Sequence, residues 1–315
     1  MIDATHTLLS LIPTFLGTLG TGIGQGLIGT QALQSMQKQP SAAESLAKLC
    51  IIATAVSETA AILCLVISIL LLSDTQTINL SWSLYGVTGM VIAVGISGFC
   101  AGIASSFPAI AASKSLARQP FAQTKILNIM LITQTLIMTP NVFGFLIALL
   151  IKGKMPQTES FTQALQLLSS GLSIGLGCIG PSIGLSLFAY QACHAVGVNK
   201  KAYGKILTFT FICEAIIETP VIFALLIGLL ILNSTINPES FIQGWQFLGA
   251  ALCIGLSTIS PGINSGRTGK AACLAMAYAP ESYQNLSKIT MLALAMIDSF
   301  AIYGLLISIV LIVAS

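Results

Sequence analysis

Apolar residues dominate this sequence in long stretches that are separated by short polar segments. Each stretch reaches the length that spans a bilayer, about 20 residues or more. The stretches cover residues 7–34, 46–73, 82–113, 122–151, 161–194, 203–232, 242–278 and 286–314. We expect each of them to be a helix, because hydrocarbon offers no hydrogen-bond partners to an open backbone. The pattern therefore predicts an all-α integral membrane protein with eight transmembrane helices.

The composition of the 315 residues agrees with this prediction and excludes other classes of protein. Only 7% of the residues are charged and the mean hydropathy is +0.92, whereas soluble domains carry roughly 25% charged residues. The net charge of +3 gives no electrostatic basis for binding nucleic acid. The chain has two histidines and no CxxC pair, and its eight cysteines lie mostly in apolar stretches. We therefore expect no metal site, disulfide framework or cofactor.

The polar segments at the two ends of the spans differ in charge. The segments after the first, third, fifth and seventh spans hold Lys38, Lys48, Lys114, Arg118, Lys125, Lys200, Lys201, Lys205 and Lys288. The opposite side holds Asp3, Asp74, Glu159 and Glu239, with Lys152 and Lys154 as its basic residues. The positive-inside rule then places the hairpin loops in the cytoplasm and both termini outside. No basic segment precedes the first span, so we predict no cleavable signal peptide and take a bacterial plasma membrane as the simplest location.

The chain repeats itself every 80 residues without an insertion or deletion. Lys38-Gln39-Pro40 recurs as Arg118-Gln119-Pro120. One column of the repeat holds Glu58-Thr59, Met138-Thr139, Glu218-Thr219 and Asp298-Ser299. Such a period marks tandem copies of one structural unit. We expect four helical hairpins, at residues 1–80, 81–160, 161–240 and 241–315.

The two helices of each hairpin differ in the size of their side chains. The odd-numbered spans are rich in glycine and other small residues, as in the segment 18–26, where small residues recur four positions apart. This spacing lets helix backbones approach closely inside a membrane. The even-numbered spans are rich in Leu and Ile. We expect an inner layer of closely packed odd-numbered helices and an outer layer that faces lipid.

Three of the four repeats carry a carboxylate in the middle of an even-numbered span. Glu58, Glu218 and Asp298 each lie 18 residues beyond repeat position 40, 200 or 280, which is about 20–25 Å along a helix. A charge at mid-bilayer costs at least about 2.5–3.5 kcal/mol, so carboxylates there are candidates for function. Desolvation favours the protonated acid. Such a group either ionises where it meets water or a cationic partner, or stays ionised while it coordinates a cation. Both behaviours suit a reversible cation carrier rather than a catalyst of bond breaking.

Three features together resemble the proteolipid rotor-ring subunit (the c or K subunit) of rotary ATP synthases and ATPases. They are the glycine-rich first helix, the Lys/Arg-Gln-Pro turn, and the mid-helix Glu 18 residues beyond that proline. The resemblance covers nearly the whole chain as four fused units. The turn is similar to that of F-type subunits, whereas fusion into several hairpins is similar to V-type proteolipids.

The resemblance implies a segment of an oligomeric ring built from copies of this chain. The ring would turn against a stator subunit and carry H+ or Na+, and an arginine in a stator half-channel would discharge each carboxylate. Such a subunit by itself hydrolyses nothing. The cytoplasmic turns would contact the central stalk through Lys38, Gln39, Pro40, Arg118, Gln119, Pro120, Lys200 and Lys201.

The resemblance also implies a set of ion ligands. In sodium-binding members, a Gln at the position of Gln25 and the carboxylate at Glu58 come from one hairpin, and a hydroxyl and a backbone carbonyl come from its neighbour. All four repeats keep the hydroxyl, as Thr59, Thr139, Thr219 and Ser299. Pro140 and Pro220 remove the helix bonds to the carbonyls of Leu136 and Ile216, the position of the sodium ligand. A carbonyl freed in this way is either an ion ligand or part of a kink.

Other residues favour protons over sodium. The column of Gln25 changes to Ser105, Leu185 and Ser265. Glu214 lies one turn before Glu218, so the two carboxyls would share a proton unless they coordinate an ion. Only Tyr303, near Asp298, remains of the tyrosine that hydrogen-bonds the carboxylate in the family. We prefer H+ slightly over Na+.

Two departures from the family pattern matter for function. Met138 replaces the carboxylate of the second repeat, so we expect that hairpin to carry no ion. Fewer ions per turn supply less energy for each ATP, which suits ATP-driven pumping better than synthesis. Arg267, in an inner helix, either pairs with Asp298 and silences it or extends toward the cytoplasm, and we favour the second.

A function from another class is a non-rotating eight-helix cation transporter or pore with the carboxylates along a central path. Transporters often contain inverted repeats, whereas these four repeats have the same orientation. A purely structural proteolipid leaves the carboxylate column unexplained.

Overall fold

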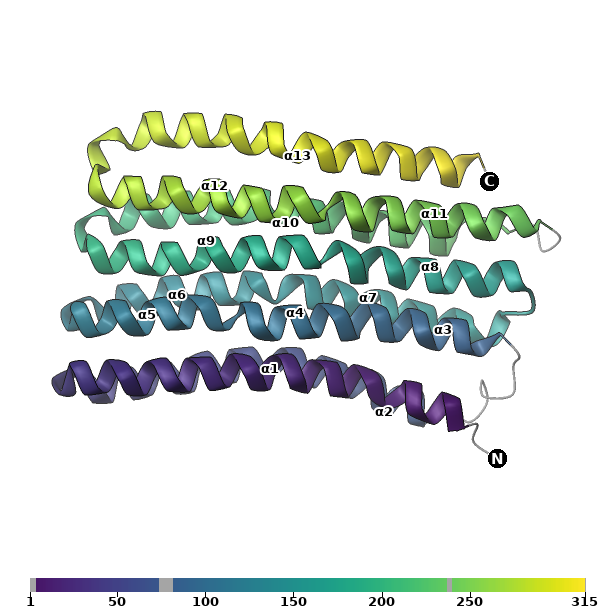
Figure 1. The fold of residues 1–315 in the computed structure, drawn as a ribbon, viewed down its shortest axis with the longest axis horizontal. Coiled ribbons are helices and arrows are strands. Elements are labelled where there is room, and N and C mark those ends of the chain that lie inside the picture. The colour runs from purple at the N-terminus through teal and green to yellow at the C-terminus, as the bar shows by residue number, and fades with distance from the viewer. Residues whose placement is uncertain (1–3, 74–81, 237–239, 315) are drawn as a thin grey trace.

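The computed structural model describes residues 4–73, 82–236 and 240–314, and these residues form an all-helical protein (Figure 1). Within them, eight apolar helical segments are long enough to cross a membrane. They span Ala4–Lys38, Pro40–Leu72, Ser83–Arg118, Pro120–Gln157, Phe161–Val198, Lys200–Asn233, Phe241–Tyr278 and Pro280–Val313. The predicted eight transmembrane helices are confirmed. Asp3, Asp74 and Glu239, which we assigned to the side opposite the hairpin loops, lie outside the described residues.

Some of the eight segments consist of more than one helix. The α-helices are α1 (Ala4–Lys38), α2 (Ala43–Leu72), α3 (Ser83–Met90), α4 (Ser97–Ala104), α5 (Ser106–Arg118), α6 (Gln123–Ile137), α7 (Thr139–Lys154), α8 (Phe161–Gly177), α9 (Ile179–Val198), α10 (Tyr203–Asn233), α11 (Phe241–Ser257), α12 (Ile259–Tyr278) and α13 (Tyr283–Val313). A π-helical stretch, Val91–Ile96, connects α3 to α4. Short 3-10 turns, Pro40–Ala42, Pro120–Ala122, Lys200–Ala202 and Pro280–Ser282, close the hairpins.

Prolines account for the breaks inside the long segments. The breaks at Ser105, Met138, Cys178 and Thr258 precede Pro108, Pro140, Pro181 and Pro261 by two or three residues. A proline lacks the N–H that continues the helix, and its ring clashes with the carbonyl four residues back. Proline alone does not decide the outcome, because α10 continues through Pro220.

The helices form two layers that run along the molecule (Figure 1). The inner layer contains α1, α3–α5, α8–α9 and α11–α12, and each span in it contacts the next: α1 with α4 and α5, α5 with α9, and α9 with α12. The outer layer contains α2, α6–α7, α10 and α13, which also contact one another in this order. Each outer helix packs against the inner helix of its own hairpin, as α1 does with α2.

Glycine lets the inner helices approach to backbone contact. A Cβ atom added to Gly24 would lie 2.3 Å from the carbonyl oxygen of Gly102, and one added to Gly184 would lie 1.9 Å from that of Gly262. No side chain fits at such distances, so these positions require glycine. By contrast, Gly22 and Gly26 of α1 have no atom within 4 Å of an added Cβ. The side of α1 that bears Gly22 and Gly26 is therefore uncovered in a single chain.

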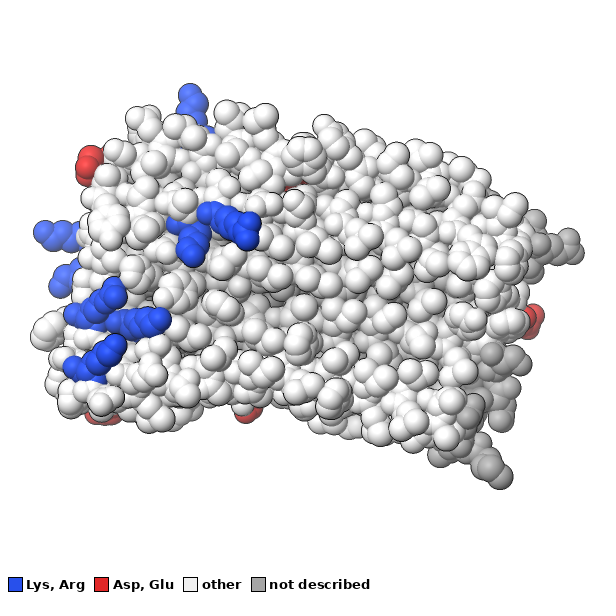
Figure 2. All heavy atoms as spheres, viewed as in Figure 1, with Lys and Arg blue, Asp and Glu red and all other residues white. Residues whose placement is uncertain are grey.

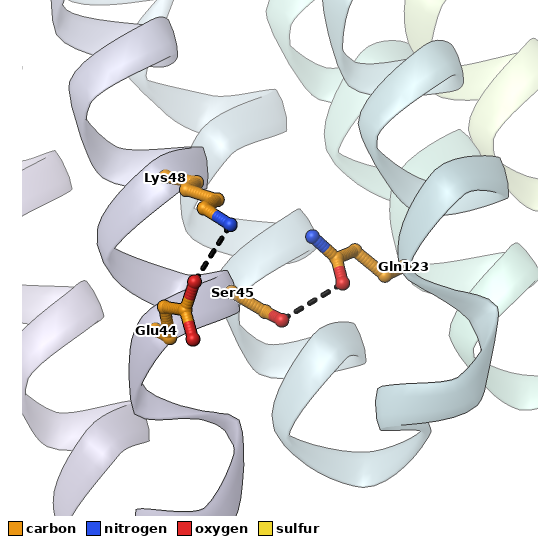
Figure 3. A network of polar contacts seen from close by, with 4 residues as sticks. All are labelled: Glu44, Ser45, Lys48 and Gln123. Carbon is orange, nitrogen blue, oxygen red and sulfur yellow. Dashed lines mark hydrogen bonds and ion pairs between the residues drawn. The ribbon is translucent and has the colours of Figure 1, made fainter.

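Charged side chains gather at the end of the molecule where the hairpins turn, at the left of Figure 2. In the close-up of this end, Lys48 Nζ lies 2.7 Å from Glu44 Oε1, the one ion pair among the described residues (Figure 3). Beside it, the Ser45 hydroxyl donates a hydrogen bond of 2.8 Å to Gln123 Oε1, which joins α2 to α6 (Figure 3). Polar contacts between consecutive outer helices thus connect one hairpin to the next.

Candidate ion-binding site

The carboxylate column lies in the middle of the outer layer. Glu58, Glu218 and Asp298 each stand close to the midpoint of a helix of 30 or 31 residues, namely α2, α10 and α13. Both Glu218 and Asp298 are only 8% exposed. Glu58 is exposed instead, because no other described outer helix covers the side of α2 that faces away from α6 and α7.

Polar side chains of the inner layer reach the carboxylates of the first and fourth hairpins. Gln25 Nε2 donates to Glu58 Oε1 at 3.2 Å and lies 3.3 Å from the carbonyl oxygen of Thr54. Ser265, in the same repeat column as Gln25, donates from its hydroxyl to Asp298 Oδ1 at 3.2 Å. The structure therefore brings together inner and outer residues of one hairpin, as the family resemblance implies for Gln25 and Glu58. Leu185 offers no such contact to Glu218 in the third hairpin.

Thr139 shows which neighbour approaches each carboxylate. This residue belongs to the second hairpin, and its hydroxyl lies beside the Glu218 carboxyl of the third. Thr59 of the first hairpin and Met138 of the second likewise line one groove. Met138 stands in the column of Glu218, as Thr59 stands in the column of Thr139. Glu218 thus meets the hydroxyl of the preceding hairpin, an order that the sequence left open.

The four hydroxyls of the column all donate to a backbone carbonyl three or four residues earlier in the chain. Thr59 donates to Val56 at 2.8 Å, Thr219 to Ala215 at 3.1 Å and Ser299 to Met296 at 2.7 Å. Thr139 donates to Leu136, so the carbonyl that Pro140 was expected to free is occupied. Because a hydroxyl has one proton, each oxygen is left to accept a hydrogen bond from a protonated carboxyl or to coordinate a cation.

Glu214 is the most deeply buried carboxyl of the described residues. It is 0% exposed, and neither of its oxygens has a hydrogen-bond partner within the described part of the chain. Gln134 occupies the same column one repeat earlier, and its Nε2 donates to the carbonyl oxygens of Ala53 at 2.9 Å and Ser105 at 3.1 Å. An unprotonated carboxylate cannot make these bonds, because it only accepts.

The second hairpin has no acid in this column. Met138 is buried beside Ala60 and Ala101, and an apolar groove of about 730 Å³ lies between α2 and α6–α7 at this level. Neither Met138 nor Gln134 titrates. The predicted absence of an acid from this hairpin's column is thus a feature of the packing as well as of the sequence.

Among the described residues, neither Arg267 nor Tyr303 forms an ion pair or a hydrogen bond with Asp298. Arg267 Nη1 donates to Asn264 Oδ1 at 3.4 Å, and no ion pair joins it to Asp298 in the described ranges. The Tyr303 side chain is 59% exposed and packs edge-on against Phe300. It makes no hydrogen bond to Asp298 among the residues that the structure describes, so Ser265 is the side chain that holds this acid.

The predicted stalk-contacting turns lie together at one end of the molecule. Their side chains connect successive hairpins: Gln119 Nε2 donates to the Gly197 carbonyl at 2.9 Å, and Lys125 Nζ reaches that of Lys200 at 3.4 Å. Lys38, Lys200 and Lys201 are exposed, and Gln39 donates to Ser41 within its own turn. Sequence reasoning missed Phe121, which follows Pro120 and is 98% exposed. An aromatic residue in a polar turn was the signal available.

Comparison with known proteins identifies the family. The model of the family described as the ATP synthase C subunit matches residues 8–71, 168–231 and 248–311, which contain Glu58, Glu218 and Asp298 respectively. The chain belongs to the ATP synthase C-subunit family. It is accordingly a non-catalytic, multi-pass membrane subunit of the rotor-ring c/K type of a rotary ATP synthase.

The matches to individual relatives differ in length. The chain is 30% identical over 224 residues to the K subunit of the A-type ATP synthase of Methanocaldococcus jannaschii, which covers 71% of this chain and 94% of that protein. It is 40% identical over 68 residues to the ATP synthase c subunit of Dehalococcoides mccartyi, covering 22% of this chain and 90% of the relative. The ATP synthase c subunit of Chloroflexus aurantiacus is 36% identical over 69 residues, with 22% and 91% covered.

Proposed function

We propose that Glu58, Glu218 and Asp298 are the ion carriers of this rotor subunit and that H+ is the ion. The observation that carries the proposal is the repeated pairing at mid-helix. Gln25 and Ser265 hold the acids of their own hairpins, and Thr139 of the preceding hairpin faces Glu218. Because the Thr139 hydroxyl already donates to a backbone carbonyl, its oxygen can accept a hydrogen bond from a protonated Glu218. Each acid would bind its proton facing lipid and lose it to water beside a stator arginine.

Na+ is the second candidate, and the first hairpin favours it. Gln25, Glu58 and the neighbouring column hydroxyl supply the oxygen-rich set that a hard cation prefers. The third hairpin argues against Na+, because Leu185 supplies no ligand where the first hairpin has Gln25. A subunit with three carriers of one kind therefore fits H+ better.

Glu214 belongs to the same proposal as a second acid at the third site. It lies one helical turn from Glu218 on α10, and two adjacent carboxyls favour sharing a proton over double ionisation. Its neighbours include the thiols of Cys193, Cys213 and Cys273, which carry no positive charge to stabilise an anion. We propose that Glu214 stays protonated and supports proton rather than sodium binding there.

The two edges of the chain support closure into a ring of copies. Gly22 and Gly26 of α1 are uncovered, whereas the equivalent Gly262 and Gly266 of α12 pack against α9. Ser299 lies on α13 at the opposite edge, and no further outer helix covers it among the described residues. A second copy that placed its Ser299 beside Glu58 would cover Gly22 and Gly26. It would also give Glu58 a hydroxyl from a preceding hairpin, as Thr139 does for Glu218.

We propose four repeat units at 1–80, 81–160, 161–240 and 241–315, with their turns in the cytoplasm of a bacterial cell and the termini outside. The turns would bind the central stalk. We add Phe121 to the turn residues that would contact the stalk, because it is exposed. With Met138 in one of four hairpins, the ring would move fewer ions per turn and favour ATP-driven pumping.

The test is ion uptake by the assembled complex in sealed vesicles. Glu218→Gln should abolish ATP-driven H+ uptake, because every turn of the ring brings this hairpin past the stator. Glu159→Gln, which changes an exposed carboxylate outside the column, is the matched control and should pump normally. Pumping by Glu218→Gln at the wild-type rate would refute the assignment. H+ flux through the purified chain alone would favour the non-rotating pore.

A further inference from the structure

A pocket lies on the inner-layer face, near the hairpin turns and away from the carboxylate column. It has a volume of about 340 Å³ and lies between the ends of α1, α5 and α9. Its lining includes Ser35, Lys38, Lys114, Arg118, Tyr190 and His194. This is the face shown in Figure 2, where Lys and Arg side chains gather toward the turn end.

The cations of the pocket are held in place by neutral groups. Lys114 Nζ donates to the Tyr190 hydroxyl at 3.2 Å and lies 5.5 Å from the centre of its ring. Arg118 Nη1 lies 2.9 Å from His194 Nε2. Because a guanidinium only donates, this ring nitrogen accepts and the imidazole carries no charge. The positive charge of the pocket therefore comes from Lys38, Lys114 and Arg118.

No carboxylate balances these three charges. The lining contains no Asp or Glu, and the one ion pair of the described residues, Lys48–Glu44, is formed on α2. The pair formed by Lys38 and Arg118 is not repeated in the third and fourth hairpins. The column of Lys38 and Arg118 continues as Val198 and Tyr278, so the pocket is not a general consequence of the repeat.

We propose that this pocket binds the phosphate group of an anionic phospholipid. An Arg fork beside two Lys point charges matches the oxygens of a phosphate. The pocket stands in the last turns of the inner helices, at the depth of lipid headgroups, and basic pockets between transmembrane helices bind such headgroups. Free phosphate has the same chemistry without the acyl chains and is the other source of this ligand. The site gives Lys38 and Arg118 a role beyond stalk contact and does not depend on the ion carriers.

The experiment is native mass spectrometry of the purified, delipidated subunit in detergent. Phosphatidylglycerol, phosphatidylcholine and inorganic phosphate are titrated separately. We expect phosphatidylglycerol to bind more tightly than phosphatidylcholine. Lys114→Gln should weaken the binding of phosphatidylglycerol about fivefold, since one basic residue near a lipid surface contributes about 1 kcal/mol. Lys288→Gln, which removes an exposed charge from the outer layer, is the matched control and should bind as the wild type does.

Two further measurements keep the proposal open to refutation. Arg118→Lys keeps the positive charge but loses the guanidinium that can make two hydrogen bonds to a phosphate. This variant should bind phosphatidylglycerol more weakly than the wild type, and it serves as the test if Lys114→Gln fails to assemble. Binding of inorganic phosphate that displaces the lipid at equal concentration would assign the pocket to a free anion and overturn the lipid proposal. Equal affinity for the two lipids, or equal affinity of wild type and both pocket variants, would also overturn it.

Discussion

At the scale of single residues, Gln134 and Glu214 show how one repeat position serves two purposes. Gln134 donates to the backbone carbonyls of Ala53 and Ser105 and so connects α6 to α2 and to the inner layer. Glu214 occupies the same place in the next repeat without a partner for either oxygen among the described residues. The backbone around Gln134 offers two acceptors, at Ala53 and Ser105, which an amide can satisfy and an ionised carboxylate cannot.

A reciprocal pair of substitutions tests this reasoning. We expect Glu214→Gln to raise the stability of the subunit, because an unsatisfied buried polar group costs about 1–3 kcal/mol. Gln134→Glu should lower it by a similar amount. Thermal unfolding in detergent, followed by circular dichroism, measures both. A Glu214→Gln variant that melts below the wild type would show that the acid has a partner and would count against this account.

Asp298 gives a second prediction at the residue scale. Its contact in the structure is the Ser265 hydroxyl at 3.2 Å rather than Arg267. We therefore expect Arg267→Gln to leave carbodiimide labelling of Asp298 unchanged, whereas an ion pair that silenced Asp298 would be broken and labelling would rise. Mass mapping of the labelled peptide distinguishes the two results.

The sequence predicts individual site residues unevenly. The pairing of Gln25 with Glu58 was implied by the resemblance to the rotor-ring family, and in the structure Gln25 Nε2 donates to Glu58 Oε1 at 3.2 Å. Ser265 stands in the same repeat column as Gln25, but its hydrogen bond to Asp298 could be found only in the structure. A short side chain reaches its partner only where the two helices lie close together. The approach of Thr139 to Glu218 depends on the direction in which hairpins follow one another, which no repeat pattern contains.

At the scale of helices, glycine sets how closely the inner layer packs. Gly24→Ala would place a methyl group 2.3 Å from the Gly102 carbonyl oxygen. We expect this substitution to push α1 from α4 and lower the melting temperature of the subunit. Gly153→Ala, at a position with no atom within 4 Å of the added Cβ, is the control and should melt close to the wild type. Equal melting of both variants would contradict the packing described.

The helices themselves were predictable in number but not in continuity. Their length and hydropathy are sufficient to identify eight spans, because a bilayer imposes both. The breaks at Ser105, Cys178 and Thr258 depend on whether neighbouring helices support the backbone around a proline. Pro220 shows the difference, since α10 continues through it, whereas the helix before Pro140 ends at Ile137.

At the scale of the whole molecule, the uncovered edges predict how copies meet. Gly184 of α9 packs against Gly262 and Gly266 of α12. If the next copy continues this order, Asn264 of one chain meets Gly22 and Gly26 of another. Asn264→Cys combined with Gly26→Cys, in a chain whose native cysteines are replaced by serine or alanine, should then form intermolecular disulfides and a ladder of multimers on a non-reducing gel. Asn264→Cys alone should give no ladder, and a ladder-free double variant would exclude this contact.

The central claim is that Glu58, Glu218 and Asp298 exchange a cation at the middle of the membrane. Carbodiimide labelling of the purified subunit, with peptide mapping and with or without Na+, tests it most directly, because the reagent attacks protonated carboxyls that face lipid. The account predicts labelling at Glu58 and Glu218 that falls as pH rises and does not change with Na+, and no label on the peptide around Met138. Protection by Na+ at fixed pH would identify sodium as the ion. No labelling of any of the three acids in folded protein would contradict the account.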